Sequence, residues 1–298
     1  MTYTFTQPTE ATLRDFVTVR NPDPESEYSR AAEAFAQGRL ELSKRRLFTA
    51  DERPLAALTR APVPRPIYHL RAEPDLTEAD ALELLRFAAT LGEAGGPATL
   101  NYTAGTAPDL SALALEQGWT LEAHVRGYRT DLSRRDDLEA DPTARTFPVA
   151  HLLSGDFLAF YRPVWMHDVD TQELKPLLEE VRNFHDYNES GEGVYLFDGE
   201  QPVAAGVVSY GEPADMTLIG VSPEYRNKGW GRRLHRHLMW LAKNRTRVYV
   251  GSTDVRNRPM LRLFERNGCT FGSEVWQLAA PPEGAETPLR PDPPGSFP

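Results

Sequence analysis

Two glycines and three basic residues meet in one short stretch of the sequence. Gly229 and Gly231 leave the backbone open to a ligand, and Arg226, Lys228 and Arg232 add positive charge around them. The stretch follows a β-rich run and precedes a run of leucines at helical spacing. A helix that begins behind such a loop directs its first backbone N–H groups toward whatever binds there. We therefore predict that this turn binds an anionic diphosphate.

A family resemblance rests on this loop and on a second stretch downstream. Residues 226–231 resemble the Arg/Gln-x-x-Gly-x-Gly/Ala signature of the GCN5-related N-acetyltransferase (GNAT) superfamily, directly after a matching residue run 221–225. Residues 257–268 are similar to the superfamily's Asn-x-x-x-x-x-hydrophobic-Tyr-Glu-x-x-Gly pattern after the fifth strand. The resemblance covers residues 165–278.

The resemblance implies acetyl-coenzyme A as co-substrate. In the superfamily the fourth and fifth strands splay apart, pantetheine lies between them, and the loop amides hold the pyrophosphate. Carried over, Ile219 and Val221 meet pantetheine and the loop meets the phosphates. The cofactor-binding residues expected on this basis are Ile219, Gly220, Val221, Arg226, Asn227, Lys228, Gly229, Trp230, Gly231, Arg232, Asn257 and Phe264.

The resemblance also implies a reaction without a covalent enzyme intermediate. An amine attacks the thioester directly, a backbone N–H near Val221 stabilises the developing oxyanion, and a base takes the amine proton. Many relatives have a tyrosine that protonates the leaving thiolate, but this chain has Phe264 in its place. A thiol pKa near 8.5 makes the thiolate a tolerable leaving group without that acid.

No motif fixes the catalytic base. Glu212 and Asp215, at the turn that enters the expected fourth strand, are the catalytic candidates, against the alternative of a merely solvated turn. A second cluster, His185, Asp186 and Tyr187, follows a helix that usually walls the acceptor site. This cluster fits a substrate contact and an ordinary helix end equally well.

Other reactive residue types have simpler explanations. His235 and His237 flank Arg236 on a predicted helix, and we expect them to be solvated surface residues rather than metal ligands. Cys269 is the only cysteine and is expected to be packed in the core rather than reactive. Asn257 is expected to cap the following helix, a role compatible with a cofactor contact.

The elements that must position the loop are visible in the hydrophobic pattern. Strands are expected at residues 193–197, 202–210, 216–221 and 247–252, and helices at residues 170–188, 231–244 and 259–267. The first three strands are separated by turn formers, which favours an antiparallel meander.

The N-terminal half ends with the same order of elements as the C-terminal half. Residues 98–103 are expected as a strand, residues 108–117 as a helix, and residues 77–91 as a helix with a threonine cap. Gly118-Trp119-Thr120-Leu121 parallels Gly268-Cys269-Thr270-Phe271 at an offset of 150 positions, which indicates duplication. Between residues 72 and 77, where the other half has its basic loop, this half has two acids and no glycine, so a phosphate would be repelled there.

Two α/β domains follow from these observations. Each is expected to have a GNAT-like, mixed and mostly antiparallel central sheet flanked by helices. Residues 133–147 read as a linker, so we predict a degenerate domain over 1–143 and an acetyl-CoA-binding domain over 144–280. Residues 281–298, rich in proline, are expected to form a disordered tail.

Composition sets limits on partners. The chain has 40% hydrophobic and 26% charged residues and no apolar run near the length of a membrane span, and its N-terminus lacks the pattern of a signal peptide, so we expect a cytoplasmic protein. A net charge of −10 argues against nucleic acid as a partner. A single cysteine argues against disulfide or thiolate-metal frameworks, so no metal is expected.

We therefore predict an N-acetyltransferase that acts on a primary amine of a small molecule, with a mild preference for a cationic acceptor because of the acidic surface. Two alternatives remain. A non-catalytic acyl-CoA-binding or sensor protein would account for Phe264 and for the unassigned base. A protein or peptide N-acetyltransferase would need a peptide-sized groove.

Overall fold

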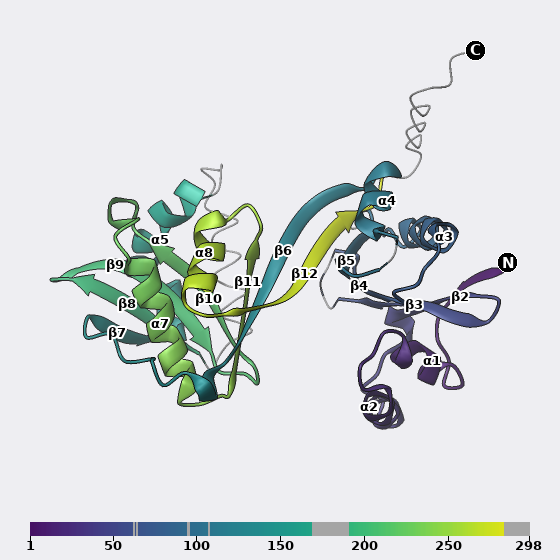
Figure 1. The fold of residues 1–298 in the computed structure, drawn as a ribbon, viewed down its shortest axis with the longest axis horizontal. Coiled ribbons are helices and arrows are strands. Elements are labelled where there is room, and N and C mark those ends of the chain that lie inside the picture. The colour runs from purple at the N-terminus through teal and green to yellow at the C-terminus, as the bar shows by residue number, and fades with distance from the viewer. Residues whose placement is uncertain (62, 64, 94–95, 107, 169–190, 283–298) are drawn as a thin grey trace, which may run out of the picture. The chain divides into compact units, whose positions relative to one another are not determined.

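The computed structural model describes residues 1–282, apart from residues 62, 64, 94–95, 107 and 169–190, and its chain divides into two compact units. The N-terminal unit comprises residues 1–125 and 273–298, and the C-terminal unit comprises residues 126–272. Both units are mixed α/β structures, which confirms the predicted fold class (Figure 1). No helix in the described part of the chain is long and apolar enough to cross a membrane.

The C-terminal unit is built on a sheet of mostly antiparallel strands. Its strands lie in the order β6-β11-β10-β9-β8-β7. β9 pairs antiparallel with β8 and β10, β8 pairs antiparallel with β7, and β10 pairs parallel with β11. The elements are η2 Leu132–Arg134, β7 Ala144–Pro148, η3 Val149–Leu153, α5 Gly155–Asp168, β8 Glu192–Asp198, β9 Gln201–Ser209, β10 Ala214–Val221, η4 Pro223–Tyr225, α7 Trp230–Lys243, β11 Val248–Asp254 and α8 Arg258–Arg266.

Strand β9 shows why this sheet lies between two layers. Its central residues are all buried, as expected for a strand covered on both faces. Ala204 and Val208 belong to the core beneath α7, whereas Ala205 and Val207 belong to the core beneath α5. Because side chains alternate along a strand, α5 and α7 cover opposite faces of the sheet.

The N-terminal unit repeats the plan. Its strands lie in the order β1-β2-β3-β4-β5-β12, antiparallel except for the parallel pair β4 and β5. The core under α3 and the core under α1 and α2 use alternate residues of the same strands. The elements are β1 Tyr3–Thr6, α1 Leu13–Thr18, α2 Pro24–Ala36, η1 Leu42–Lys44, β2 Arg45–Ala50, β3 Arg53–Arg60, β4 Ile67–Ala72, α3 Glu78–Ala89, β5 Thr99–Thr103 and α4 Leu110–Glu116.

Two long strands carry the chain between the units. β6 (Thr120–Asp131) begins in the N-terminal unit and ends in the C-terminal unit, and β12 (Thr270–Ala279) runs the other way. Each strand follows a helix that ends at a glycine of positive φ, Gly118 at +81° and Gly268 at +73°. The structure therefore shows a helix, a glycine and a long strand in the same order twice, at the positions that the sequence repeat indicated.

The division into units differs from the predicted boundary at residue 143. Residues 132–148 contain η2 and β7 and lie within the C-terminal unit, so the prediction of a linker over 133–147 was wrong. The many charges of this segment suggested solvent exposure, but several are used to hold the segment on α7. Arg236 contacts Asp137 at 2.9 Å, and Arg233 contacts Asp141 at 2.8 Å. The predicted helix at 170–188 and the predicted tail from residue 283 onward lie outside the described residues.

Candidate active site

A cavity in the C-terminal unit lies beside the end of β10, a strand that separates from its parallel neighbour β11. The register of β10 with β11 joins Ala214 to Tyr249 and Asp215 to Val250, although both strands continue beyond these pairs. In the N-terminal unit the corresponding strands stay paired over four positions, from Ile67 with Thr99 onward. The splay that the resemblance implied is therefore present in the C-terminal unit, directly after Asp215.

An irregularity in β10 lies at the same place. Its register with β9 shifts between Thr217 and Gly220, so Leu218 and Ile219 stand opposite the single residue Gly206. Leu218 takes a positive φ of 51°, which is rare for a residue with a branched side chain. A bulge of this kind turns the strand and interrupts its ladder of hydrogen bonds. Backbone polar groups of β10 therefore become available beside the cavity.

The cavity has a volume of about 380 Å³ and combines an apolar wall with the predicted loop. Ile219 and Val221 line it from β10, and Met260 and Leu263 line it from α8. Its remaining lining residues are Gly220, Tyr225, Arg226, Asn227, Gly229, Trp230, Gly231, Asn257 and Pro259. An apolar slot that ends at a polar loop suits an extended chain carrying a charged group at one end.

The start of α7 leaves backbone donors without a side-chain cap. Gly229 is the capping residue, with a φ of +87°, and it has no side chain to accept from the helix. The first intrahelical bond of this turn runs from the N–H of Arg233 to the carbonyl of Gly229. The N–H groups of the first turn are thus oriented toward the loop, where they favour an anion.

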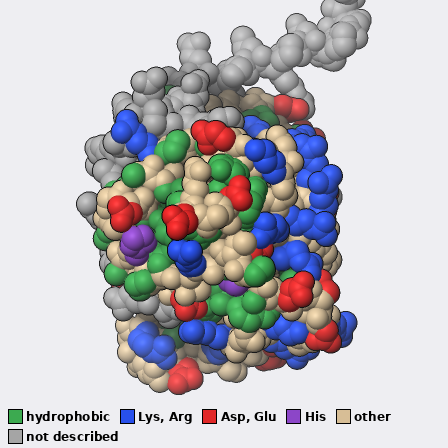
Figure 2. All heavy atoms as spheres, turned by 90° about the vertical axis from the view of Figure 1, so that its left-hand side faces the viewer, with side chains coloured by type: hydrophobic (Ala, Val, Ile, Leu, Met, Phe, Trp, Pro, Cys, Tyr) green, Lys and Arg blue, Asp and Glu red, His purple; other side chains and the backbone are tan. Residues whose placement is uncertain are grey.

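A second cavity of about 540 Å³ continues from the first and is strongly basic. It shares Asn227, Gly229, Gly231, Pro259 and Leu263 with the first cavity. Arg232 enters it from α7, and Arg262 and Arg266 enter it from α8. Figure 2 shows Lys and Arg side chains gathered along one side of the face that it draws, although the chain carries a net charge of −10. The basic cavity can hold phosphate groups through both charge and backbone amides.

Two of the three glycines that line the cavities lack a side chain for different reasons. At Gly231 a Cβ would lie 3.3 Å from Leu263 and 3.5 Å from Val221, so the missing side chain keeps the passage between α7, α8 and β10 open. At Gly220 a Cβ would lie 2.5 Å from Val164 on α5. Gly220 lines the cavity, but the packing of α5 already requires a glycine there.

Several predicted cofactor residues have partners within the protein, and Arg232 donates from Nε to the Asn267 side chain at 3.4 Å. Arg226 donates from Nε to the carbonyl of Val221 at 3.1 Å, which holds the loop closed on itself. Lys228 lies with its Nζ 5.1 Å from the centre of the Tyr225 ring and does not line either cavity. Trp230 lines the first cavity, and the Arg233 guanidinium lies over its ring at 4.2 Å.

The second sequence motif divides between the cavity and the core. Asn257 lines the cavity, and its side chain also accepts from the N–H of Met260 at 3.2 Å as the cap of α8, as predicted. Phe264 is not among the lining residues of the cavity. Its ring is 1% exposed and stacks on Tyr128 with 4.6 Å between the ring centres. The structure therefore places Phe264 in the core behind the site.

The two candidate bases lie at the apex of the splay rather than in the cavity. Asp215 is the last β10 residue paired with β11, and it alternates with Ala214 and Met216 of the α7 core, so it faces the α5 side. Partial burial removes some of its hydration and raises the pKa of its carboxyl, although the residue keeps an exposed surface. Glu212 lies in the turn before β10 and accepts from the Thr246 hydroxyl at 2.9 Å.

The prediction that His235 and His237 are surface residues was wrong. Their exposed fractions are 0% and 4%. His235 joins a buried chain of contacts, 2.9 Å from Nε2 to the Tyr249 hydroxyl and 2.7 Å from Nδ1 to the Asn267 amide. Burial lowers the pKa of His235 to about 3, so the ring is neutral. Cys269 is buried as predicted, and burial raises the pKa of its thiol.

Several lining residues escaped the sequence reasoning. Tyr225, Pro259, Met260 and Leu263 complete the apolar part, and Arg262 and Arg266 supply the charge of the basic cavity. The four-residue spacing of the two arginines, which places them on one face of a helix, was the available signal. The cluster His185, Asp186 and Tyr187 lies outside the described residues.

The N-terminal unit differs at the corresponding helix start. There α3 is capped by Thr77, whose hydroxyl accepts from the N–H of Asp80 at 3.1 Å. Asp80 in turn accepts from the N–H of Thr77 at 2.9 Å, which completes a capping box. The side-chain cap that α7 lacks is thus present at α3, and it includes the carboxylate of Asp80. The two units therefore differ in whether a side chain caps this helix start.

Comparisons with known proteins point the same way. Residues 154–269 match the model of the acetyltransferase (GNAT) family. A tandem GNAT protein from the clavulanic acid biosynthesis pathway is similar in structure with a TM-score of 0.54 and 14% identity, over 94% of this chain and 98% of that one. A GCN5-related N-acetyltransferase from Sphaerobacter thermophilus has a TM-score of 0.54 and 14% identity, over 93% and 94% of the two chains.

A GNAT-family acetyltransferase from Colwellia psychrerythraea has a TM-score of 0.53 and 12% identity, over 94% of this chain and 100% of that one. At these identities the likeness shows the fold. No curated protein matches the sequence. Residues 154–269 therefore belong to the GNAT acetyltransferase family, in a chain that has the fold of tandem GNAT proteins.

Proposed function

We propose that the C-terminal unit binds acetyl-CoA and transfers its acetyl group to a primary amine of a small molecule. The observation that carries this proposal is the pair of connected cavities. An apolar slot between the end of β10 and α8 leads into a basic cavity at the uncapped start of α7. This sequence of surfaces matches the order of groups in acetyl-CoA, from the thioester and pantetheine to the phosphates.

In this arrangement the pantetheine lies along Ile219 and Val221, and the pyrophosphate meets the first N–H groups of α7. Arg232, Arg262 and Arg266 face the remaining phosphate charge. Five residues of the predicted set that line the cavities have small or medium-sized side chains, so main-chain groups there are accessible to the cofactor. These residues are Gly220, Val221, Asn227, Gly229 and Gly231.

The chemical step is direct transfer. The amine nitrogen attacks the thioester carbonyl, the C–S bond breaks, and CoA leaves as the thiolate. A backbone N–H of the bulged segment before Val221 stabilises the oxyanion. Asp215 takes the proton from the amine, directly or through water, because it lies at the apex of the splay and faces α5. Glu212 is the weaker candidate, since the Thr246 hydroxyl already binds its carboxylate.

A non-catalytic acyl-CoA-binding protein is the second candidate, and the position of Phe264 favours it. The ring is buried against Tyr128 and has no group that could protonate the thiolate. The two candidates share the cofactor site and differ in turnover. Release of CoA thiol from acetyl-CoA across a panel of amines, with spermidine as a cationic small molecule and a lysine peptide as the polymer control, separates them.

Calorimetric titration of acetyl-CoA into the full chain tests the cofactor site. Gly231→Glu places a carboxylate in the passage between Leu263 and Val221, and we expect it to abolish measurable binding. Gly155→Glu is the matched control, because a Cβ there meets no atom within 4 Å. Gly155 is the first residue of α5, whereas the cavity residue Gly220 packs against Val164 near the end of that helix. Tight binding to the Gly231→Glu protein, or no binding to the unaltered chain, would refute the proposal.

A further inference from the structure

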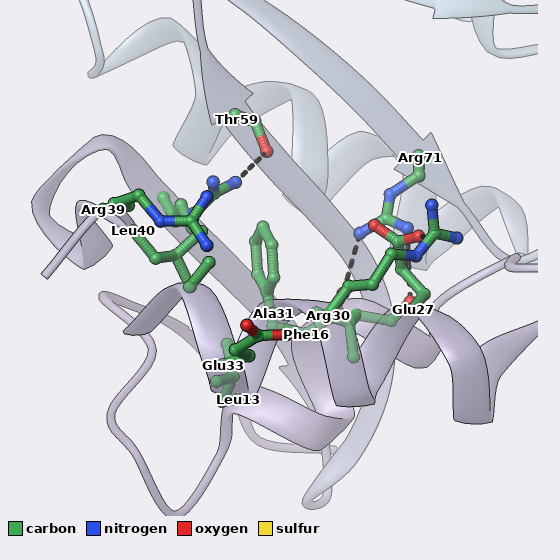
Figure 3. Close-up of a pocket in the computed structure, with 13 residues that line it drawn as sticks. Leu13, Phe16, Glu27, Arg30, Ala31, Glu33, Arg39, Leu40, Thr59 and Arg71 are labelled. Carbon is green, nitrogen blue, oxygen red and sulfur yellow. Dashed lines mark hydrogen bonds and ion pairs between the residues drawn. The ribbon is translucent and has the colours of Figure 1, made fainter. Parts of the chain in front are cut away.

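The N-terminal unit contains a cavity of its own, with a volume of about 560 Å³. It lies between α1 and α2 on one side and strands β2, β3 and β4 on the other. Leu13 and Phe16 of α1 and Ala31 of α2 give it an apolar floor, and Figure 3 shows the Phe16 ring standing between Arg39 and Arg71. Its size is within the range of small-molecule sites.

Two guanidinium groups are held inside this cavity against the apolar wall. The Arg45 and Arg71 guanidinium carbons lie 5.4 and 5.6 Å from the centre of the Phe16 ring. Burial lowers the pKa of both side chains, yet each remains a cation near neutral pH. Among the described residues, neither has a carboxylate within ion-pair distance. A desolvated charge without a counter-ion is unfavourable in a folded protein.

The acidic residues of the cavity form no ion pair with these two cations among the described residues, although the Glu27 carboxylate attracts the Arg71 charge from a longer distance. Glu27 pairs with Arg30 at 2.8 Å, and both lie on α2 at the mouth. Glu33 accepts from the Gln37 side chain at 2.9 Å. Arg39, a further cation at the rim, donates to Gln37 rather than to a carboxylate. The interior of the cavity is therefore positively charged.

Contacts within the protein account for the position of the Arg71 side chain but not for that of Arg45. Arg71 donates to the carbonyls of Phe16 and Val17, at 3.0 and 3.2 Å, and so caps the last turn of α1. Among the described residues the Arg45 side chain makes one hydrogen bond, from NH1 to the Thr59 hydroxyl at 3.0 Å, and its buried Nε has no partner. Arg71 thus has a structural role, whereas the position of Arg45 has no equivalent explanation.

Arg45 and Thr59 together form a pair of donors. The Thr59 hydroxyl oxygen accepts from Arg45, so its own proton is free to be donated into the cavity. A guanidinium edge beside a hydroxyl donor matches the two oxygens of a carboxylate. The neighbouring Phe16 ring and the aliphatic residues of α1 suit an apolar body rather than a fully polar anion such as free phosphate.

We propose that this cavity binds a small organic carboxylate, held by Arg45 and Thr59, with its apolar part against Phe16 and the aliphatic face of α1. Arg71 positions α1 as the wall of the site. The proposal concerns the N-terminal unit and does not depend on acetyl-CoA binding or on acetyl transfer.

The test is titration of the full chain with benzoate and with hexanoate, followed by ligand-observed NMR and calorimetry. The uncharged amides, benzamide and hexanamide, are the ligand controls. We expect at least one carboxylate to bind in the millimolar range or tighter, and its amide to bind at least tenfold more weakly. Arg45→Met should weaken carboxylate binding at least tenfold. Arg46→Met, the next residue of β2, should leave it unchanged.

Thr59→Val keeps the shape of the side chain and removes the hydroxyl donor. It therefore provides a second test of carboxylate binding if Arg45→Met does not fold. The unfolding transition reports whether each variant is folded. Because Arg45 is a partly buried charge with no carboxylate within ion-pair distance among the described residues, Arg45→Met should also raise the stability of the ligand-free protein. Equal binding of acid and amide, binding that survives in folded Arg45→Met or Thr59→Val, or no carboxylate binding at all would overturn the proposal.

Discussion

The carboxyl of Asp215 combines two properties that a catalytic base requires. It lies at the point where β10 and β11 separate, and its surroundings raise its pKa above that of an ordinary aspartate. A raised pKa makes the carboxylate a better proton acceptor near neutral pH. The same desolvation disfavours the folded protein when the group is ionised, so function and stability oppose each other at this residue.

We predict that Asp215→Asn lowers kcat about 10²-fold or more while leaving acetyl-CoA binding nearly unchanged. Because a base must be deprotonated, activity of the unaltered chain should fall as the pH decreases through the raised pKa of Asp215. The Asn variant should lose this dependence and unfold at a higher temperature at pH 7, since the desolvated charge is gone. Glu212→Gln is the matched control. A larger loss of kcat in Glu212→Gln than in Asp215→Asn would identify Glu212 as the catalytic base instead.

The buried His235 predicts a pH dependence of stability. The folded pKa of about 3 lies below the ordinary value of 6.5, so below pH 6.5 the unfolded chain takes up a proton that the folded chain does not. Stability is therefore lost as the pH falls from 6.5 toward 3, by up to about 1.4 kcal/mol per pH unit for this one group.

In His235→Gln the slope of unfolding free energy between pH 6.5 and 5 should be shallower by up to that amount. Chemical unfolding at each pH, followed by the fluorescence of the tryptophans, measures it. His69→Gln removes an exposed histidine on β4 and should leave the slope unchanged. An unaltered slope in His235→Gln would show that this ring does not control the acid sensitivity.

Sequence reasoning failed at His235 for a physical reason. The apolar stripe of α7 was taken to be the leucines alone, but the buried face also includes the histidines and Met239. The partners that satisfy the ring, Tyr249 and Asn267, come from β11 and from the end of α8. Nothing local in the sequence reveals that a polar side chain will find such partners in the fold.

At the scale of elements, local patterns predicted the C-terminal unit well. The expected runs correspond to β8, β9, β10, α7, β11 and α8 within a few residues, because alternation, leucine spacing and glycine or proline stops all agree there. The basic loop could be predicted as well, because it lies between two of these clearly marked elements. The segment 133–147 was misjudged because its charges form ion pairs with α7, and such long-range pairs leave no periodic signal.

The start of α8 shows an element and a site sharing one residue. Asn257 caps the helix and lines the cavity. Asn257→Ala should lower the stability of the unit by about 1 kcal/mol, and Asn257→Ser, which can still cap, should lower it much less. If the amide also contacts the cofactor, both variants should weaken acetyl-CoA binding. Binding that is unchanged in the Ser variant would limit Asn257 to the capping role.

At the scale of the whole molecule, duplication was visible in the sequence but the path of the chain was not. The offset of 150 positions predicted two similar units, and both have the same order of antiparallel and parallel strand pairs. That the last strand returns to the first unit could not be foreseen. Strand pairing over so long a separation depends on which sheet edge is open, and a repeat pattern is equally consistent with each copy keeping its own strand.

The return of β12 makes the stability of the N-terminal unit depend on residues near the C-terminus. Leu278 pairs with Leu100 of β5, is fully buried, and belongs to the core beneath α3. Leu278→Ala should therefore destabilise the N-terminal unit by about 2–5 kcal/mol. Leu121→Ala on β6, where the side chain is 44% exposed, is the matched control and should have little effect.

Hydrogen exchange distinguishes the units in the full chain. In Leu278→Ala the amides of β5 should exchange faster, while those of β9 in the C-terminal unit keep their protection. Acetyl-CoA binding should survive as well, because every residue that lines its proposed cavities lies in the C-terminal unit. Faster exchange in β9 with protected β5 amides would mean that β12 supports the unit that precedes it in the sequence, and the two copies would then not be interleaved.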